Sequence, residues 1–260
     1  MRFIVSDSYK VRAIVNIFRN LTGLVEDINL YFRDAGLYAQ GMDSSHVCLC
    51  ELNIEAGWFD SYTCDMDGVA GLHCKFMYKL LDCWVEGQTI TMTLNPQQGD
   101  KASVELTGSG TIEKSFEFPL VDLDSQLLDI PEADHQADIT MKSAQFAELI
   151  TQLSIFSTVV VFKCTQEDIH ITAKGDMGKM IAKIQDEDIE EYAIEENIEL
   201  IVSYGLPYVK KMCAFTKLSD LLYLHCSEDR PMKISYPLDG ESGGKNYIRF
   251  FLAPRMADDD

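Results

Sequence analysis

VDLDSQLLDIPEADH, residues 121–135, divides the chain into two halves of similar length. The stretch shows neither the 3.6-residue period of a helix nor the alternation of a strand, it is acidic, and it contains Pro131. These features indicate a connector between two folded parts. We therefore predict an N-terminal domain at 1–120, an interdomain connector at 121–135 and a C-terminal domain at 136–260.

Before the connector, hydrophobic periodicity predicts two helices and several half-buried strands. The helices are expected at 8–21 and 72–84; Asp7 or Ser8 can cap the first, and Phe76 is expected on the buried face of the second. The strand-like runs alternate apolar and polar residues between turns rich in Gly, Asp and Ser. They lie at 3–5, 27–32, 36–40, 46–54, 89–95, 102–108 and 111–120.

After the connector the same order of elements returns. A short strand at 138–141 precedes a helix at 143–155 that Ser143 can cap, and a further helix is expected at 207–217. The remaining strands are expected at 158–164, 168–175, 223–227, 232–238 and 246–253. Counterparts in the two halves lie roughly 130 residues apart, which indicates a duplication. The expected fold class is α+β, with antiparallel sheets and two helices in each domain.

Composition limits the class of protein. The chain of 260 residues is 47% hydrophobic and carries a net charge of −20, so it can bury a real core but is strongly acidic. The start of the chain lacks the apolar core of a signal peptide, and no run of 18 apolar residues occurs, which predicts a soluble intracellular protein. The eight cysteines form no C-x-x-C pair, so we expect reduced thiols and neither a metal site nor a cofactor.

The basic residues are concentrated on the predicted helices. These four segments carry eight of the 22 Lys and Arg residues but only two acidic ones, Asp82 and Glu148. A solvated helix face explains any one helix, but basic faces on three of the four helices of an acidic chain suit a surface that binds phosphates. The candidate DNA contacts are Arg12, Arg19, Lys75, Lys79, Lys210, Lys211 and Lys217.

Three separated motifs resemble one known family. They are Met42-Asp43-Ser44-Ser45-His46-Val47, the connector with its Leu128-Asp129-Ile130-Pro131, and the ending Phe251-Leu252-Ala253-Pro254-Arg255. Together they resemble the eukaryotic-type DNA sliding clamps, the proliferating cell nuclear antigen family. The resemblance implies the DNA clamp fold: two similar domains per subunit, and three identical subunits closed head to tail, with helices lining a hole for duplex DNA. It implies no catalytic activity.

The resemblance also implies two protein-binding surfaces. Subunits would join through the stretches 111–118 and 179–184, with Phe116, Phe118, Ile181 and Lys183 at the contact. A pocket would bind partner tails that carry a glutamine, an aliphatic residue three positions on and then two aromatics. Its matching residues are Met42, His46, Val47, Leu49, Leu128, Ile130, Pro131, Pro231, Phe251, Ala253 and Pro254. The implied partners are duplex DNA, DNA polymerase and other replication or repair proteins, and a clamp loader, in the nucleus or at a viral replication site.

The chain departs from the family at two places. Glu148 and Thr151 stand on the third helix where cellular relatives place arginines, which puts DNA contact by that helix in doubt. Gln166 stands where cellular clamps carry a lysine for ubiquitin-like modification, so this route of damage signalling is not expected. The divergence suits a viral clamp or one from a distant eukaryote.

Other functions remain as alternatives. The chain could be one subunit of a heterotrimeric checkpoint clamp, or an acidic interaction scaffold that does not use DNA. Enzymatic chemistry has no support in the sequence: Ser44-Ser45-His46 lacks the glycine-flanked nucleophile elbow, and no P-loop or dinucleotide fingerprint occurs. The acidic run 186–199 lacks the spacing of a calcium loop and predicts a solvated loop and strand edge.

Overall fold

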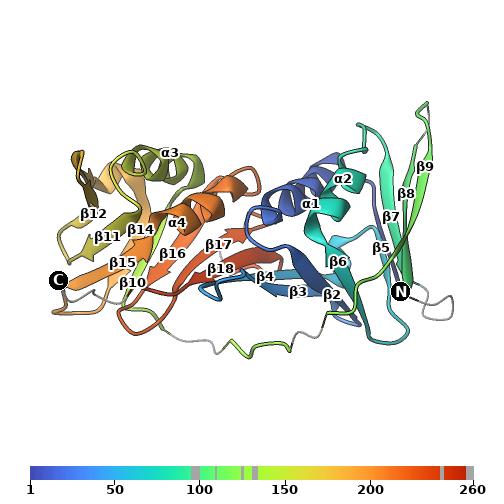
Figure 1. Ribbon diagram of the computed structural model, residues 1–260, viewed down its shortest axis with the longest axis horizontal. Helices are drawn as coiled ribbons and strands as arrows, with labels where there is room; N and C mark the ends of the chain where they lie inside the picture. The colour runs from blue at the N-terminus through green and yellow to red at the C-terminus, as the bar shows by residue number, and fades with distance from the viewer. Residues whose placement is uncertain (95–99, 109, 124–125, 131–133, 241–242, 256–260) are drawn as a thin grey trace. The chain divides into compact units, whose positions relative to one another are not determined.

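The chain forms two compact units in the computed structural model shown in Figure 1. Residues 1–94, 100–108, 110–123, 126–130, 134–240 and 243–255 are described. The first unit comprises Met1–Ser44, Glu51–Leu128 and Lys245–Tyr247, and the second Ser45–Cys50, Asp129–Gly244 and Ile248–Asp260. No helix among the described residues is long and apolar enough to cross a membrane.

The first unit contains two helices and its strands in a simple order. They are β1 (Arg2–Val5), α1 (Ser8–Leu21), β2 (Asp27–Arg33), β3 (Gly36–Met42), β4 (Cys48–Glu55), the 3-10 turn η1 (Ala56–Trp58), β5 (Ser61–Thr63), β6 (Gly68–His73), α2 (Cys74–Leu81), β7 (Thr89–Leu94), β8 (Lys101–Thr107) and β9 (Lys114–Pro119). Only the first three residues of β4 belong to the second unit.

The second unit repeats that order of helices and strands, with a further 3-10 turn after its second helix. It contains β10 (Ala137–Lys142), α3 (Ser143–Leu153), β11 (Val159–Cys164), β12 (Ile169–Gly175), β13 (Gly178–Ile184), η3 (Asp186–Asp188), β14 (Ile189–Ile194), β15 (Leu200–Gly205), α4 (Leu206–Met212), η4 (Cys213–Phe215), β16 (Leu221–Cys226), β17 (Met232–Pro237) and β18 (Tyr247–Leu252). The α+β duplication expected from the sequence is therefore confirmed.

Strand neighbours are duplicated as well. In the first unit the hydrogen-bonded orders are β5-β1-β7-β8-β9 and β4-β3-β2-β6; in the second they are β14-β10-β16-β17-β18 and β13-β12-β11-β15. The described pairings are antiparallel, for example β1 with β7 and β10 with β16. In each unit the two helices lie side by side on one face of the sheets (Figure 1).

Each core lies between the helices and the sheets of its own unit. In the first, Ile14 and Phe18 of α1 and Met77 of α2 surround a small apolar space with residues of β1–β4 and β7, among them Phe3 and Leu30. In the second, the rings of Phe215 and Phe250 pack with centroids 4.7 Å apart, and Phe162 packs edge-on against Tyr204. The helices are thus held by their apolar faces, and their polar faces remain outside.

Several local predictions are corrected by the structure. Helix α2 ends at Leu81, not at residue 84, and Phe76 is 47% exposed although its helical position predicted burial. Asp7 caps α1 as expected, with its carboxylate accepting from the Lys10 amide at 2.9 Å. Ser143 does not cap α3; its hydroxyl is buried and donates to the Ser219 carbonyl at 2.6 Å.

Two further segments can be compared with the sequence expectation. His46 is not on a strand, because β4 begins at Cys48 and His46 has φ 58°, in the left-handed region. Part of the acidic run 186–199 is the strand β14, which pairs with β10. The strand edge expected within this run is therefore present: β14 ends its strand order, and Glu190 and Glu191 are exposed on it.

Candidate functional site

The basic residues of the first unit lie on the exposed face of its helix pair. Arg12 forms an ion pair with Glu86. Arg19 lies 3.1 Å from Asp82, donates to the Tyr78 hydroxyl at 3.2 Å and sits over that ring. Both arginines therefore carry a local counter-charge, which weakens their field but still allows exchange with a phosphate.

The two α2 lysines differ from the arginines. Lys75 and Lys79 are exposed, and neither forms an ion pair with any described residue. By contrast Lys10 of α1, which the sequence did not place at the site, donates to the Trp58 carbonyl and packs against that ring. On the two helices of the first unit, Lys75 and Lys79 therefore offer positive charge that no described ion pair compensates.

In the second unit the basic residues come from α4 and its extension. Lys210 donates to the Ser154 hydroxyl at 3.3 Å, Lys211 lies over the Tyr208 ring and Lys217 is exposed after η4. Helix α3 exposes no basic side chain: its outer residues include Glu148 and Thr151, and the Thr151 hydroxyl donates to its own helix backbone. The positive charge of this helix pair therefore comes from α4 and the residues that follow it, and none comes from α3.

The first part of the connector crosses three residues that lie side by side on adjacent strands of the first unit. Asn29 of β2 is paired with Gly71 of β6 on one side and with Gln40 of β3 on the other. The chain crosses this row, and each of the three residues bonds to its backbone. Val121 donates its N–H to the Gly71 carbonyl at 2.9 Å, and the Asn29 amide donates to the Leu123 carbonyl at 3.3 Å.

The third attachment is bidentate. The Gln40 amide donates to the Leu128 carbonyl at 3.0 Å, and its carbonyl oxygen accepts the Leu128 N–H at 2.8 Å. Gln40 is buried and also donates to the Tyr38 hydroxyl, which in turn donates to the Glu51 carboxylate at 3.1 Å. A buried amide with its donors and acceptor satisfied fixes one rotamer, so Gln40 holds Leu128 in a defined place.

Gly71 is required by this crossing. A Cβ atom built there would lie 2.0 Å from the Val121 carbonyl oxygen, a contact that no side chain tolerates without moving the connector. Sequence reasoning missed Asn29, Gln40 and Gly71. Asn29 and Gln40 stand as polar residues inside strand-like runs and Gly71 precedes a predicted helix, and neither signal shows what crosses the strands.

The residues expected to bind partner peptides are distributed over both units. Met42 and Leu128 belong to the first, and His46, Val47, Leu49, Ile130, Pro231, Phe251, Ala253 and Pro254 to the second. Pro131 lies outside the described residues. None of the described members belongs to the buried core, and Leu128 is 48% exposed. Their partial exposure sets these apolar residues apart from core residues.

The two expected subunit-contact strands are sheet edges. β9 and β13 each end their strand order. Phe116 is half-buried, and Ile181 is 56% exposed on β13, where Lys183 is ion-paired with Asp168. Phe118 is different: it is 4% exposed and packs edge-on against Phe76. Its side chain belongs to the core of its own protomer, so we no longer place it at the contact.

Duplicated α+β units with outward basic helix faces and open edge strands define the class of DNA clamps. Comparison with known proteins agrees. Residues 9–127 match the family model described as "Proliferating cell nuclear antigen, N-terminal domain", and residues 129–255 match its C-terminal counterpart. The chain belongs to the proliferating cell nuclear antigen family.

Individual relatives support the same assignment. The chain is similar to the proliferating cell nuclear antigen of Caenorhabditis elegans, with 29% identity over 250 residues that cover 94% of each chain. It is also similar to that of Chaetomium thermophilum, with 28% identity over 243 residues, covering 91% of this chain and 92% of the relative. Its function is that of a sliding clamp, a processivity factor in DNA replication, in a family of non-enzymatic clamps.

Proposed function

We propose that three copies of this chain close head to tail into a ring around duplex DNA, in the nucleus or at a viral replication site. The observation that carries the proposal is the duplicated strand order. β9 ends its strand order in the first unit as β18 does in the second. β13 ends its strand order in the second unit as β4 does in the first. Inside the second unit Ala253, directly after β18, donates its N–H to the Val47 carbonyl, directly before β4, at 3.0 Å.

An equivalent pairing between copies would satisfy both open edges. β9 of one protomer would pair with β13 of the next, with Phe116, Ile181 and Lys183 at the contact. Because the two surfaces differ, the contact is heterologous and can close into a ring. The edges would otherwise remain available for uncontrolled pairing.

DNA would be held through its phosphates. Lys75, Lys79, Lys210, Lys211 and Lys217 are the main contacts in this proposal, with Arg12 and Arg19 contributing after exchange of their carboxylate partners. Phosphate contacts do not read sequence, which suits sliding. The acidic remainder of the chain repels DNA from other surfaces.

Partner tails of the glutamine, aliphatic and aromatic-pair type would bind the partly exposed apolar residues around Leu128, Ile130 and Phe251. The connector also exposes Asp122 and Asp129, so a basic flank on the tail would be favoured. DNA polymerase, repair proteins and the clamp loader would use this same surface. The remaining members of this proposed pocket are Met42, His46, Val47, Leu49, Pro231, Ala253 and Pro254, with Pro131 from outside the described residues.

Light scattering and a DNA-retention assay test the proposal together. A mass of three chains, and retention on circular but not on linear DNA after loading, would support a homotrimeric clamp. A chain that remains monomeric at micromolar concentration would instead indicate one subunit of a heterotrimeric checkpoint clamp. A trimer without retention on circular DNA would indicate a scaffold that does not use DNA.

A further inference from the structure

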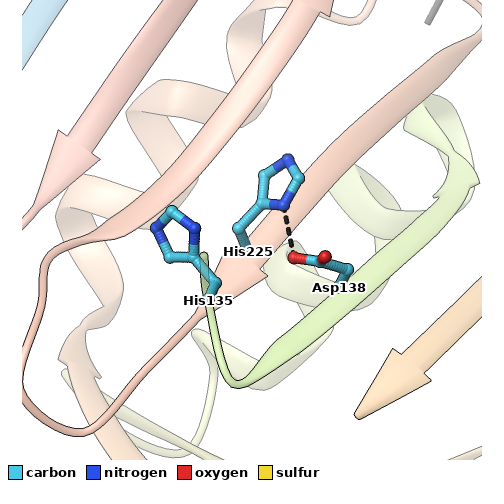
Figure 2. A group of neighbouring side chains, drawn as sticks. All are labelled: His135, Asp138 and His225. Atoms are coloured by element: carbon cyan, nitrogen blue, oxygen red, sulfur yellow. Dashed lines mark hydrogen bonds and ion pairs between the residues drawn. The ribbon is translucent and has the colours of Figure 1, made fainter. Parts of the chain in front are cut away.

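Three metal-binding side chains converge on the outside of the second unit (Figure 2). Asp138 of β10 and His225 of β16 are direct cross-strand partners, and His225 Nδ1 lies 2.5 Å from Asp138 Oδ1. His135 lies two residues before β10, and its ring centroid is 5.2 Å from that of His225. One ligand atom from each residue lies within 4.8 Å of the others.

From this geometry we propose that His135, Asp138 and His225 bind one divalent transition-metal ion, with zinc as the best match. Two imidazole nitrogens and one carboxylate oxygen form a donor set that zinc accepts, whereas magnesium and calcium require mainly oxygen. Ligand atoms of a tetrahedral zinc site lie about 3.3 Å apart, so the side chains must close in from their present separation. None of the three is fully buried, and rotation about their side-chain bonds provides that movement.

Two basic residues limit the affinity. Lys233 of β17 is the cross-strand partner of His225 on the side opposite Asp138, and the charge of Arg230 also acts on His135. Their repulsion and the absence of a fourth protein ligand make the expected affinity weaker than that of a structural four-ligand zinc site. Three protein ligands leave a fourth position for water or for a side chain of another protein.

The site would fasten the end of the connector. His135 is the last residue of the acidic stretch 121–135, whereas Asp138 and His225 belong to the sheet of the second unit. A bound ion would therefore join the chain just before β10 to two strands. This role does not depend on ring closure or on DNA.

Calorimetric titration of the full chain with zinc tests the proposal, in a Cys64→Ser/Cys83→Ser background. These are the cysteines that are not buried, and their thiols could bind zinc independently. We expect one zinc per chain, with affinity falling roughly 100-fold in either His225→Ala or Asp138→Asn. Cobalt at the same site should give the visible bands of a tetrahedral complex, which the His225→Ala variant should lose.

The chain provides a matched control in His73, which forms the same Nδ1–Oδ1 pair with Asp27 on paired strands. No third ligand group accompanies that pair among the described residues. His73→Ala should leave zinc affinity unchanged, and Lys233→Met should raise it several-fold because a repelling charge is removed. Zinc binding absent up to millimolar concentration, or lost equally in His73→Ala and His225→Ala, would overturn the site. Circular dichroism of each variant checks that folding is unchanged.

Discussion

Removal of the Gln40 side chain should release the connector at Leu128 without unfolding the first unit. Gln40→Ala deletes two hydrogen bonds to the Leu128 backbone, at 3.0 and 2.8 Å. A neutral hydrogen bond contributes about 1 kcal/mol, so the local opening free energy should fall by about 2 kcal/mol. With each 1.4 kcal/mol equal to a factor of ten, the Leu128 amide should exchange about 30-fold faster with deuterium.

Hydrogen–deuterium exchange of peptides covering 126–130 measures this effect. Gln40→Glu is an informative second variant. Its carboxylate still accepts the Leu128 N–H but cannot donate to the Leu128 carbonyl, so the rate of exchange should lie between those of the wild type and Gln40→Ala. Gln166→Ala, at an exposed glutamine, serves as the matched control. An unchanged exchange rate at Leu128 in Gln40→Ala would show that the connector is held by something other than this bidentate contact.

Three further predictions follow from the same structure. Lys75→Glu/Lys79→Glu should abolish retention on circular DNA at physiological salt and lower the salt dependence of DNA affinity, whereas Lys174→Glu on β12 should do neither. Full retention of the double variant at physiological salt would contradict the assignment. Phe116→Ala should weaken the trimer by about 2 kcal/mol in analytical ultracentrifugation, and an unchanged trimer would remove Phe116 from the contact. Leu128→Ala/Ile130→Ala should weaken peptide binding by about 2–4 kcal/mol in calorimetry while the trimer persists, because each buried methylene that is lost contributes about 0.8 kcal/mol. Equal affinity would show that the peptide binds elsewhere.

Hydrophobic periodicity predicted the limits of the helices best where the local sequence signals agree with the packing in the fold. Helix α1 was predicted at its observed limits because an apolar stripe and the Asp7 cap indicate the same start. The end of α2 was missed because Trp84 continues the apolar pattern beyond the last helical turn. The strand edge predicted within the acidic run 186–199 is β14, which lies at the end of its strand order beside β10.

The attachment of the connector could not be predicted from sequence. Gln40 and Asn29 become neighbours through strand register, and Gly71 joins them through another pairing. The metal-binding group has the same origin, since His135 and His225 are 90 residues apart and meet only through the pairing of β10 with β16. The exposure of the basic helix residues, by contrast, could be predicted directly, because helical faces follow from local spacing.

The hydrogen bonds described from Gly71, Asn29 and Gln40 go to main-chain atoms of the connector, at Val121, Leu123 and Leu128. These bonds are therefore independent of which side chains the connector carries. Selection can change the residues presented to partners at 121–128, and so alter which tails bind, while the segment keeps its course across the sheet. Substitution would then be restricted at the three strand residues beneath the connector. It would be most restricted at Gly71, where even a methyl group has no room.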